Sequence, residues 1–223
     1  MNTELKKMIL EGEHLNQDFK HCISDSRKIA RSLVAFANTD GGRLLVGVKD
    51  NGNIAGVRTD EEYYMVESAA KIYSNPPIAF NTRQHIVDQK TVLEVIVENS
   101  PNKPHFAQDT ENKWWAYYRL HDENKLANKV MIEVWRKQQS KTGIFIRYSN
   151  DEKFLLDYLA ETESISQSAF SRKAQITYKK AATILSDFIV LGILRPVFGG
   201  QQIRYALADS FDRSDYDRSE TAR

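Results

Sequence analysis

The sequence predicts an α+β protein made of two domains and a tail. Over residues 1–140, helical periodicity alternates with strand-like segments, a pattern typical of a mixed sheet with helices packed on it. The polar stretch Gln138–Thr142 ends that pattern, so we place the domain boundary near Lys141. Residues 141–208 carry three helical patterns followed by two strands, which predicts a winged helix-turn-helix domain.

The composition is that of a globular protein and excludes several classes. Of the 223 residues, 41% are apolar and 27% are charged, which excludes collagen-like, mucin-like and wholly disordered chains. Because the net charge is only +1, any argument for nucleic acid must come from local clustering. Cys22 is the only cysteine, which excludes an intrachain disulfide and a cysteine-based zinc site. No apolar run approaches ~18 residues and no signal-peptide pattern opens the chain, so we expect a cytoplasmic protein without a membrane partner.

Each element of the first domain has a local cause. Thr3 can cap a short helix, and Ile29 and Leu33 fall at helical spacing in a second one. Paired glycines at Gly41-Gly42 and the turn Asp50-Asn51-Gly52 separate the next strands. The expected helices cover residues 3–10, 25–38, 59 to the stop at 75–77, and 128–138, and the expected strands cover 14–22, 43–48, 53–57, 78–86, 91–98 and 114–120.

The second domain is equally regular. Its expected helices begin at Asn150 or Asp151, at Ser166 and at Thr177, and the third ends at Gly192. Two strands, residues 193–198 and 202–207, complete residues 141–208 as a winged helix. Charges of both signs alternate in residues 209–223, so we expect a disordered tail there.

Several segments of the first domain resemble a known family. They are GEHLNQDFK at residues 12–20, AFANTDGGRLLVGV at 35–48 and KDNGNIAGV at 49–57, followed by Lys103-Pro104-His105 and Ala116-Tyr117-Tyr118-Arg119. In this order they resemble the Schlafen-type AlbA domain over roughly residues 5–138. The resemblance implies an AlbA-like mixed-sheet fold and a DNA-binding role, as in many bacterial regulators.

The second domain has its own resemblance. Residues 165–173 (ISQSAFSRK), Tyr178, Ala181-Ala182 and residues 192–196 (GILRP) are similar to the gamma winged helix of the FtsK translocase. Other bacterial winged helices share this pattern. The resemblance implies that the helix beginning at Thr177 is a DNA-recognition helix.

The glycines of the first domain invite a phosphate-binding interpretation, because some members of the Schlafen-type family are labelled ATP-binding. However, the chain contains no G-x-x-x-x-G-K-[ST] pattern. We therefore assign Gly41, Gly42 and Gly52 to turns and expect no ATP.

Three acidic residues form a candidate metal site. Glu13, Asp18 and Asp50 would converge if the strand carrying Asp18 lies beside the strand that ends near Asp50. Three carboxylates around Mg²⁺ or Mn²⁺ are a nuclease arrangement, and the resemblance adds that ribonuclease members use an acidic trio here. The alternative, which we favour, is that these residues are strand-end and turn charges and that the protein uses no cofactor.

Basic residues supply the candidate nucleic-acid contacts. In the first domain, neighbouring elements carry Lys20, Arg27, Lys28, Arg31, Arg43 and Arg119, which would line one phosphate-binding surface. In the second domain, the candidates lie before the recognition helix, in its first turn and on the wing: Arg172, Lys173, Tyr178, Lys179, Lys180 and Arg204. The alternative for each set is an ordinary solvated surface or a protein-contact surface.

The aromatic segment Trp114–Leu120 suggests a base-stacking platform, but we assign it to the core or to a dimer face. The five histidines lack metal-ligand spacing.

The leading hypothesis is a homodimeric, non-enzymatic protein that binds duplex DNA as a bacterial-type transcriptional regulator. The alternatives are a Schlafen-like metal-dependent nuclease acting on RNA or DNA and an assembly scaffold.

Overall fold

The computed structural model describes residues 3–57, 60–140, 143, 149–200 and 202–211, and the chain divides into two compact units, Met1–Ala127 and Asn128–Arg223. The N-terminal unit contains α1 (Thr3–Glu11), β1 (Gln17–Lys20), α2 (Ser26–Asn38), β2 (Gly42–Val46), α3 (Glu61–Lys71), β3 (Ser74–Asn75), β4 (Asn81–Val87), β5 (Lys90–Val97), β6 (Phe106–Gln108), β7 (Trp114–Trp115), β8 (Tyr117–Leu120) and β9 (Glu123–Leu126). The C-terminal unit contains α4 (Lys129–Gln138), α5 (Asn150–Glu161), β10 (Ile165–Ser166), α6 (Gln167–Lys173), α7 (Tyr178–Val190), β11 (Leu194–Val197) and β12 (Arg204–Leu207).

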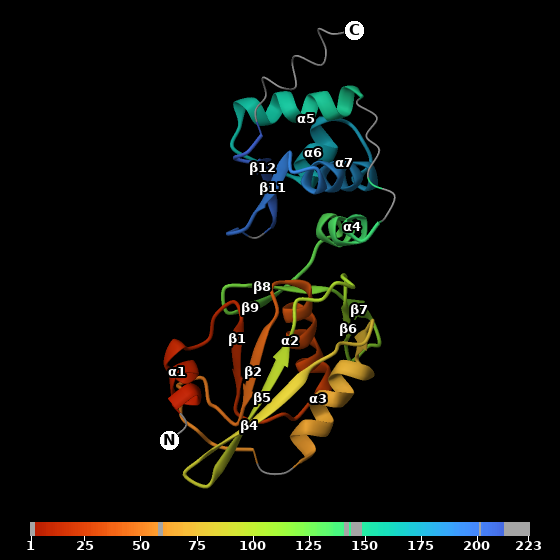
Figure 1. Ribbon diagram of the computed structural model, residues 1–223. Coiled ribbons are helices and arrows are strands. Elements are labelled where there is room, and N and C mark those ends of the chain that lie inside the picture. Colours follow the sequence, from red (N-terminus) through yellow and green to blue (C-terminus); the bar gives the residue numbers. More distant parts are fainter. Residues whose placement is uncertain (1–2, 58–59, 141–142, 144–148, 201, 212–223) are drawn as a thin grey trace. The chain divides into compact units, whose positions relative to one another are not determined.

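A four-stranded mixed sheet organises the N-terminal unit. Its strand order is β1-β2-β5-β4, and β1 runs parallel to β2 while the other neighbours are antiparallel. Side chains alternate along β2, so Leu44 and Val46 join the core beneath α2 and α3, whereas Leu45 joins a smaller core beneath α1. The helices therefore cover both faces of this sheet (Figure 1).

The paired glycines join α2 to β2 where no side chain fits. Gly41 adopts φ +74°, and its N–H donates to the carbonyl of Phe36 over 3.0 Å. At Gly42 a Cβ atom would lie 2.4 Å from the Phe36 ring and 2.8 Å from the carbonyl oxygen of Asn16. This close approach confirms the turn expected at this position.

Two small sheets accompany the main one, and they correct the expected strand at residues 114–120. Trp114–Trp115 is β7, in the sheet β3-β6-β7, whereas Tyr117–Leu120 is β8, which pairs with β9. Ala116 separates them because its buried carbonyl accepts from the N–H of Ala127 over 2.9 Å instead of continuing either ladder. The aromatic segment 114–120 is therefore divided between two sheets.

Other expected elements are shorter or absent. The strand expected at 14–22 is reduced to β1, and the one at 53–57 is replaced by a single bridge between Val48 and Ile54. That segment turns away because the N–H groups of Ala55 and Gly56 both donate to the carbonyl of Gly47. The expected cap of the third helix, Thr59, lies outside the described residues.

In the C-terminal unit, α4 packs along α7, and the three-stranded sheet has the order β10-β12-β11. Lys137 of α4 donates to the hydroxyl of Ser186 over 2.7 Å and pairs with Asp187 at 2.9 Å. The boundary near Lys141 thus differs from the observed division after Ala127, because the helix before the polar stretch packs on α7. Of the expected tail, residues 212–223 lie outside the described residues.

The described part of the chain contains no helix with the length and apolar character that crossing a membrane requires.

We predict that Gly42→Ala destabilises the protein by about 1–3 kcal/mol, because the added methyl group overlaps the Phe36 ring and the Asn16 carbonyl. Gly200→Ala is the control, since its Cβ would meet nothing closer than 3.9 Å. Thermal unfolding of both variants measures the difference, and an unchanged melting temperature for Gly42→Ala would contradict the packing argument.

Candidate functional site

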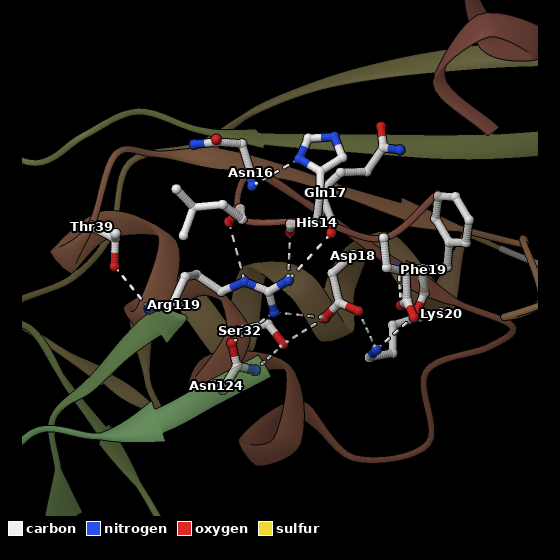
Figure 2. Close-up of polar contacts among 12 residues, drawn as sticks. His14, Asn16, Gln17, Asp18, Phe19, Lys20, Ser32, Thr39, Arg119 and Asn124 are labelled. Carbon is white, nitrogen blue, oxygen red and sulfur yellow. Dashed lines mark hydrogen bonds and ion pairs between the residues drawn. The ribbon is translucent and has the colours of Figure 1, made fainter. Parts of the chain in front are cut away.

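A buried arginine lies at the centre of the polar network in the N-terminal unit (Figure 2). Arg119 of β8 donates to the carbonyl oxygens of His14, Leu15 and Gln17 over 2.8, 3.2 and 3.3 Å. It also donates to Asn124 Oδ1 over 3.0 Å. Its guanidinium stacks on the ring of Phe36, with 5.0 Å to the centroid. Arg119 was expected to contact phosphate, but its side chain is only 1% exposed. Arg119 is therefore a structural residue that connects β8 to the backbone of residues 14–17.

Asp18 supplies the negative charge beside Arg119. Its carboxylate lies 2.8 Å from Lys20 Nζ and 3.9 Å from Arg119 Nη1, and it accepts from the hydroxyl of Ser32 over 3.2 Å. Burial alone would raise the pKa of Asp18, but the hydrogen bond from Glu13 together with Lys20 and Arg119 lowers it. Asp18 is therefore the ionised member of this group.

Glu13 is the neighbour of Asp18 with the raised pKa. Its carboxyl accepts from the N–H of Phe19 over 2.9 Å. Burial, and after it the hydrogen bond to Asp18, raise the pKa of Glu13 to about 7. Two carboxyl groups this close favour sharing one proton, because two adjacent negative charges repel. The structure therefore brings together two of the three expected acids.

Asp50 does not complete the expected trio. It lies exposed in the turn after β2. Among the described residues, no group of three histidine, cysteine, aspartate or glutamate side chains is placed to hold a metal ion. Parallel pairing sets Asp18 opposite Leu44, so the chain leaves the sheet before it reaches Asp50.

A second set of buried hydrogen bonds, made by Asn38 and His105, was not predicted from the sequence. Asn38, the last residue of α2, donates to the carbonyls of His105 and Tyr117, each over 2.9 Å, and accepts from the N–H of His105 over 2.8 Å. The ring of His105 bonds the carbonyl of Pro76 through Nδ1 and the hydroxyl of Ser100 through Nε2. Because a carbonyl only accepts, Nδ1 carries a proton. Burial lowers the pKa of His105, which favours the neutral form of the ring. A polar residue directly after the apolar run at residues 33–37 was the available signal.

The basic residues of this unit do not share one surface. Arg43 lies on the α1 side of the sheet, 3.9 Å from Glu94, and Lys20 donates to Asp18 and to the carbonyl of Phe19. Arg27, Lys28 and Arg31 lie on α2, at the opposite face of the sheet from Arg43. The structure therefore does not bring the six expected residues onto one surface, and nucleic-acid contact by the α2 group stays a prediction.

An open hollow of about 350 Å³ lies beside the glycine turn. Besides backbone of Gly41 and Gly42, it is lined by Arg43 and Arg83 and by the acidic residues Glu4, Asp40, Glu94 and Glu98. Acidic side chains outnumber basic ones on its wall. This charge balance does not suit a nucleoside triphosphate.

In the C-terminal unit the basic candidates have different surroundings. Tyr178 and Lys179 are exposed in the first turn of α7, while Lys180 forms an ion pair with Asp151 of α5. Arg172 and Lys173 are exposed at the end of α6, with Lys173 Nζ 5.1 Å from the ring centroid of Tyr158. Arg204 donates to the hydroxyl and carbonyl of Ser164 over 2.8 and 2.7 Å, so its guanidinium fastens β12 to the segment before β10.

We predict that Arg119→Ala destabilises the protein by about 3 kcal/mol or more, because it leaves buried carbonyl groups and part of the Asp18 charge without a partner. The exposed Arg83→Ala, whose ion pair with Glu4 lies at the surface, is the matched control and should change stability by no more than about 0.5 kcal/mol. Chemical denaturation measures both values. Equal effects would show that Arg119 is not a structural brace.

A pH prediction follows from Glu13. Its pKa in the folded protein lies above the ordinary value of 4.5, so its contribution to stability is complete below that value and is lost as pH rises through about 7. Glu13→Gln cannot titrate. The wild type should therefore lose stability relative to this variant between about pH 5 and about pH 8, measured as melting temperatures. Glu11→Gln is the control, and a parallel pH profile for wild type and Glu13→Gln would contradict the assignment.

Comparison with known proteins identifies the N-terminal unit. The family model described as "Schlafen, AlbA_2" matches residues 13–128, more than half of the chain. The crystal structure of the DIP2311 protein from Corynebacterium diphtheriae is similar over 98% of this chain, with 16% identity and a TM-score of 0.50, and this chain spans 52% of that one. The solution structure of the N-terminal domain of a Nitrosomonas europaea protein, described as related to the ATP-dependent DNA helicase RecG, matches 54% of this chain and is itself covered over 91%, with 22% identity and a TM-score of 0.41. From the match over residues 13–128, the chain belongs to the Schlafen AlbA_2 family.

Proposed function

We propose that this protein binds duplex DNA through its C-terminal unit and acts as a bacterial-type transcriptional regulator. The observation that carries the proposal is the exposed first turn of α7. Thr177, Tyr178, Lys179 and Lys180 are all exposed there, whereas the following residues Ala181 and Ala182 are buried. A helix that presents polar and basic side chains at its N-terminal end can place them on base edges in a major groove.

The elements around α7 support a winged helix-turn-helix arrangement. The turn between α6 and α7 is held by Ser171, whose hydroxyl donates to the carbonyl of Ile176 over 2.7 Å. Gln167 at the start of α6 donates to the carbonyl of Tyr178 over 2.9 Å, which fixes the angle between the two helices. The hairpin of β11 and β12 follows α7 and would be the wing. This order agrees with the resemblance to the FtsK gamma domain.

The cations near α7 should contribute unequally. Lys180 already pairs with Asp151, so contacting a phosphate would require that it leave or share this partner. Arg204 is engaged with Ser164. Lys179, Arg172 and Lys173 form no ion pair with the described residues, and these are the phosphate contacts that we propose. Tyr178, which is 54% exposed, is the proposed base-edge contact.

The two other expectations have less support. A nuclease would need a third ligand beside Glu13 and Asp18, and the described residues supply none. A two-fold homodimer would place two C-terminal units on half-sites about 34 Å apart, and it stays a prediction. The segment Trp114–Leu120 is a poor choice for its interface, because it is divided between two sheets and Tyr118 and Arg119 are buried.

We predict that Lys179→Ala weakens binding to duplex DNA and reduces the slope of log affinity against log salt by about 0.9, the loss of one phosphate contact. Lys180→Ala should change the slope less, because Lys180 pairs with Asp151. Lys129→Ala on α4 is the control. Gel-shift or anisotropy titrations at several salt concentrations measure the slopes, and an unchanged slope for Lys179→Ala would remove α7 from the DNA interface.

A further inference from the structure

The two edges of the four-stranded sheet differ in what occupies their backbone groups. At the β1 edge, Gln17 exchanges backbone hydrogen bonds with His14 over 3.0 and 3.1 Å. The N–H of Phe19 donates to Glu13 Oε1 over 2.9 Å, and its carbonyl accepts from Lys20 Nζ over 2.7 Å. The backbone groups of β1 that point away from β2 therefore already have partners, so a further strand cannot pair there.

The β4 edge has no such protection. β4 is the last strand in the order β1-β2-β5-β4, and within the described part of the chain it pairs only with β5 (Figure 1). All seven residues from Asn81 to Val87 pair one to one with β5, without a bulge. The strand contains no proline and no lysine, which are residues that block exposed edges in many proteins. A regular open edge of this length is a template for pairing with another strand.

The hairpin turn shows which residues of β4 face this open edge. Asp88 and Gln89 have positive φ angles of 49° and 63°, as in a two-residue type I′ turn. In such a turn the carbonyl of Val87 accepts from the N–H of Lys90, and hydrogen-bonded pairs then alternate with non-bonded pairs along the two strands. Three residues therefore turn their N–H and C=O groups away from β5: Thr82, Gln84 and Ile86.

Apolar side chains lie at both ends of this edge. Gln84 opposes Leu93, which joins the core beneath α2 and α3, so the even-numbered residues of β4 lie on that face of the sheet. At one end Ile86 is 70% exposed. At the other end Phe80 packs on the same core, and its ring centroid lies 6.2 Å from that of Tyr63, which is 38% exposed. The edge thus joins an exposed aliphatic side chain to exposed aromatic surface.

A second copy of β4 would match these two ends. If it runs antiparallel with Gln84 opposite Gln84, then Thr82 opposes Ile86, and the outward backbone groups of all three residues find partners. Ile86 of the second copy would lie diagonal to Phe80, a position about 7–8 Å away that aromatic side chains reach. The two-fold axis repeats the contact, so each copy covers the exposed apolar surface of the other.

The opposite face of the strand accepts the same pairing. Arg83 would oppose His85 of the second copy, and His85 is buried beside Glu94, with 2.8 Å between Nε2 and Oε2. The Arg83 side chains of the two copies would be diagonal to each other. Each lies 3.6 Å from Glu4 Oε1 of its own copy, which offsets their repulsion.

We propose that β4 is the interface of a two-fold homodimer, in which two four-stranded sheets join edge to edge. The partner is a second copy of this chain, because the exposed Ile86 and the surface of Phe80 and Tyr63 complement each other only through a two-fold axis. Since the β1 edge is closed, the assembly stops at two copies. The inference goes beyond the proposed function and does not depend on DNA binding.

Sedimentation equilibrium of the full-length chain without DNA tests the proposal. The mass should rise with concentration towards twice that of one chain. Gln84→Pro should stay folded but monomeric, because proline removes an N–H that points away from β5 and leaves the existing ladder intact. Ile86→Ala should raise the dimer dissociation constant by about 10-fold or more, since each dimer loses two buried side chains. Leu10→Ala, which removes a 77% exposed side chain from α1, is the control and should dimerise as the wild type does.

Cross-linking tests the register. In a Cys22→Ser background, which removes the exposed cysteine, Gln84→Cys should form a disulfide-linked dimer under mild oxidation. The Cα atoms of a hydrogen-bonded antiparallel pair are about 5.5 Å apart, a distance that a disulfide spans. Thr82→Cys is the matched control on the same exposed edge. Its two copies would lie about 14 Å apart and should not cross-link.

The outcomes separate this inference from the proposed function. A wild type that stays monomeric at its highest soluble concentration overturns the inference, and so does a folded Gln84→Pro that dimerises normally. Equal cross-linking at positions 82 and 84 also overturns it. Circular dichroism and thermal unfolding confirm that each variant is folded. A dimer that binds no duplex DNA contradicts only the proposed function, whereas a monomer that binds duplex through Lys179 contradicts only the dimer interface.

Discussion

The burial of the Arg119 guanidinium is the interaction on which the N-terminal unit depends. A buried cation is tolerated only when its donors find acceptors, and here three backbone carbonyls, Asn124 and the Asp18 carboxylate surround it. The carbonyls belong to the two residues His14 and Leu15 before β1 and to Gln17, the first residue of β1, while Arg119 itself belongs to the small sheet β8-β9. One side chain thus fastens a peripheral hairpin to the first strand of the main sheet.

The same network sets the chemistry of the two neighbouring acids. Asp18 faces Arg119 and Lys20, which lower its pKa, whereas Glu13 is partly buried beside that negative charge and its pKa is raised to about 7. These charges are balanced within the unit, so they hold its fold together. Asn38 works alongside them by tying the end of α2 to the segments around His105 and Tyr117. Much of the family's sequence motif therefore serves to position the backbone.

Local signals predicted the long elements well. Helix α2 shows helical spacing over thirteen residues behind an Asp25 cap, and α7 follows a Thr177 cap, so both were expected nearly as they are found. The hairpin of β4 and β5 was expected because Asp88 and Gln89 form a turn between two apolar runs. The strands β3, β6 and β9 were missed, since two to four residues are too few to show a period of two and their partners are distant in sequence.

The sequence by itself determined the α+β class, the order of the main helices and strands, the family resemblance and the candidate basic residues, because caps, turns and periodicity act over a few neighbouring residues. Only the tertiary structure decided which of those residues are available. Arg119 and Arg27 have the same charge, but Arg119 meets a carbonyl 105 residues earlier in the chain and is buried, while Arg27 stacks on Tyr73 at the surface. Trp114, which the sequence assigned to the core or to a dimer face, is likewise found exposed. Burial depends on contacts between distant segments, and a local pattern carries no record of them.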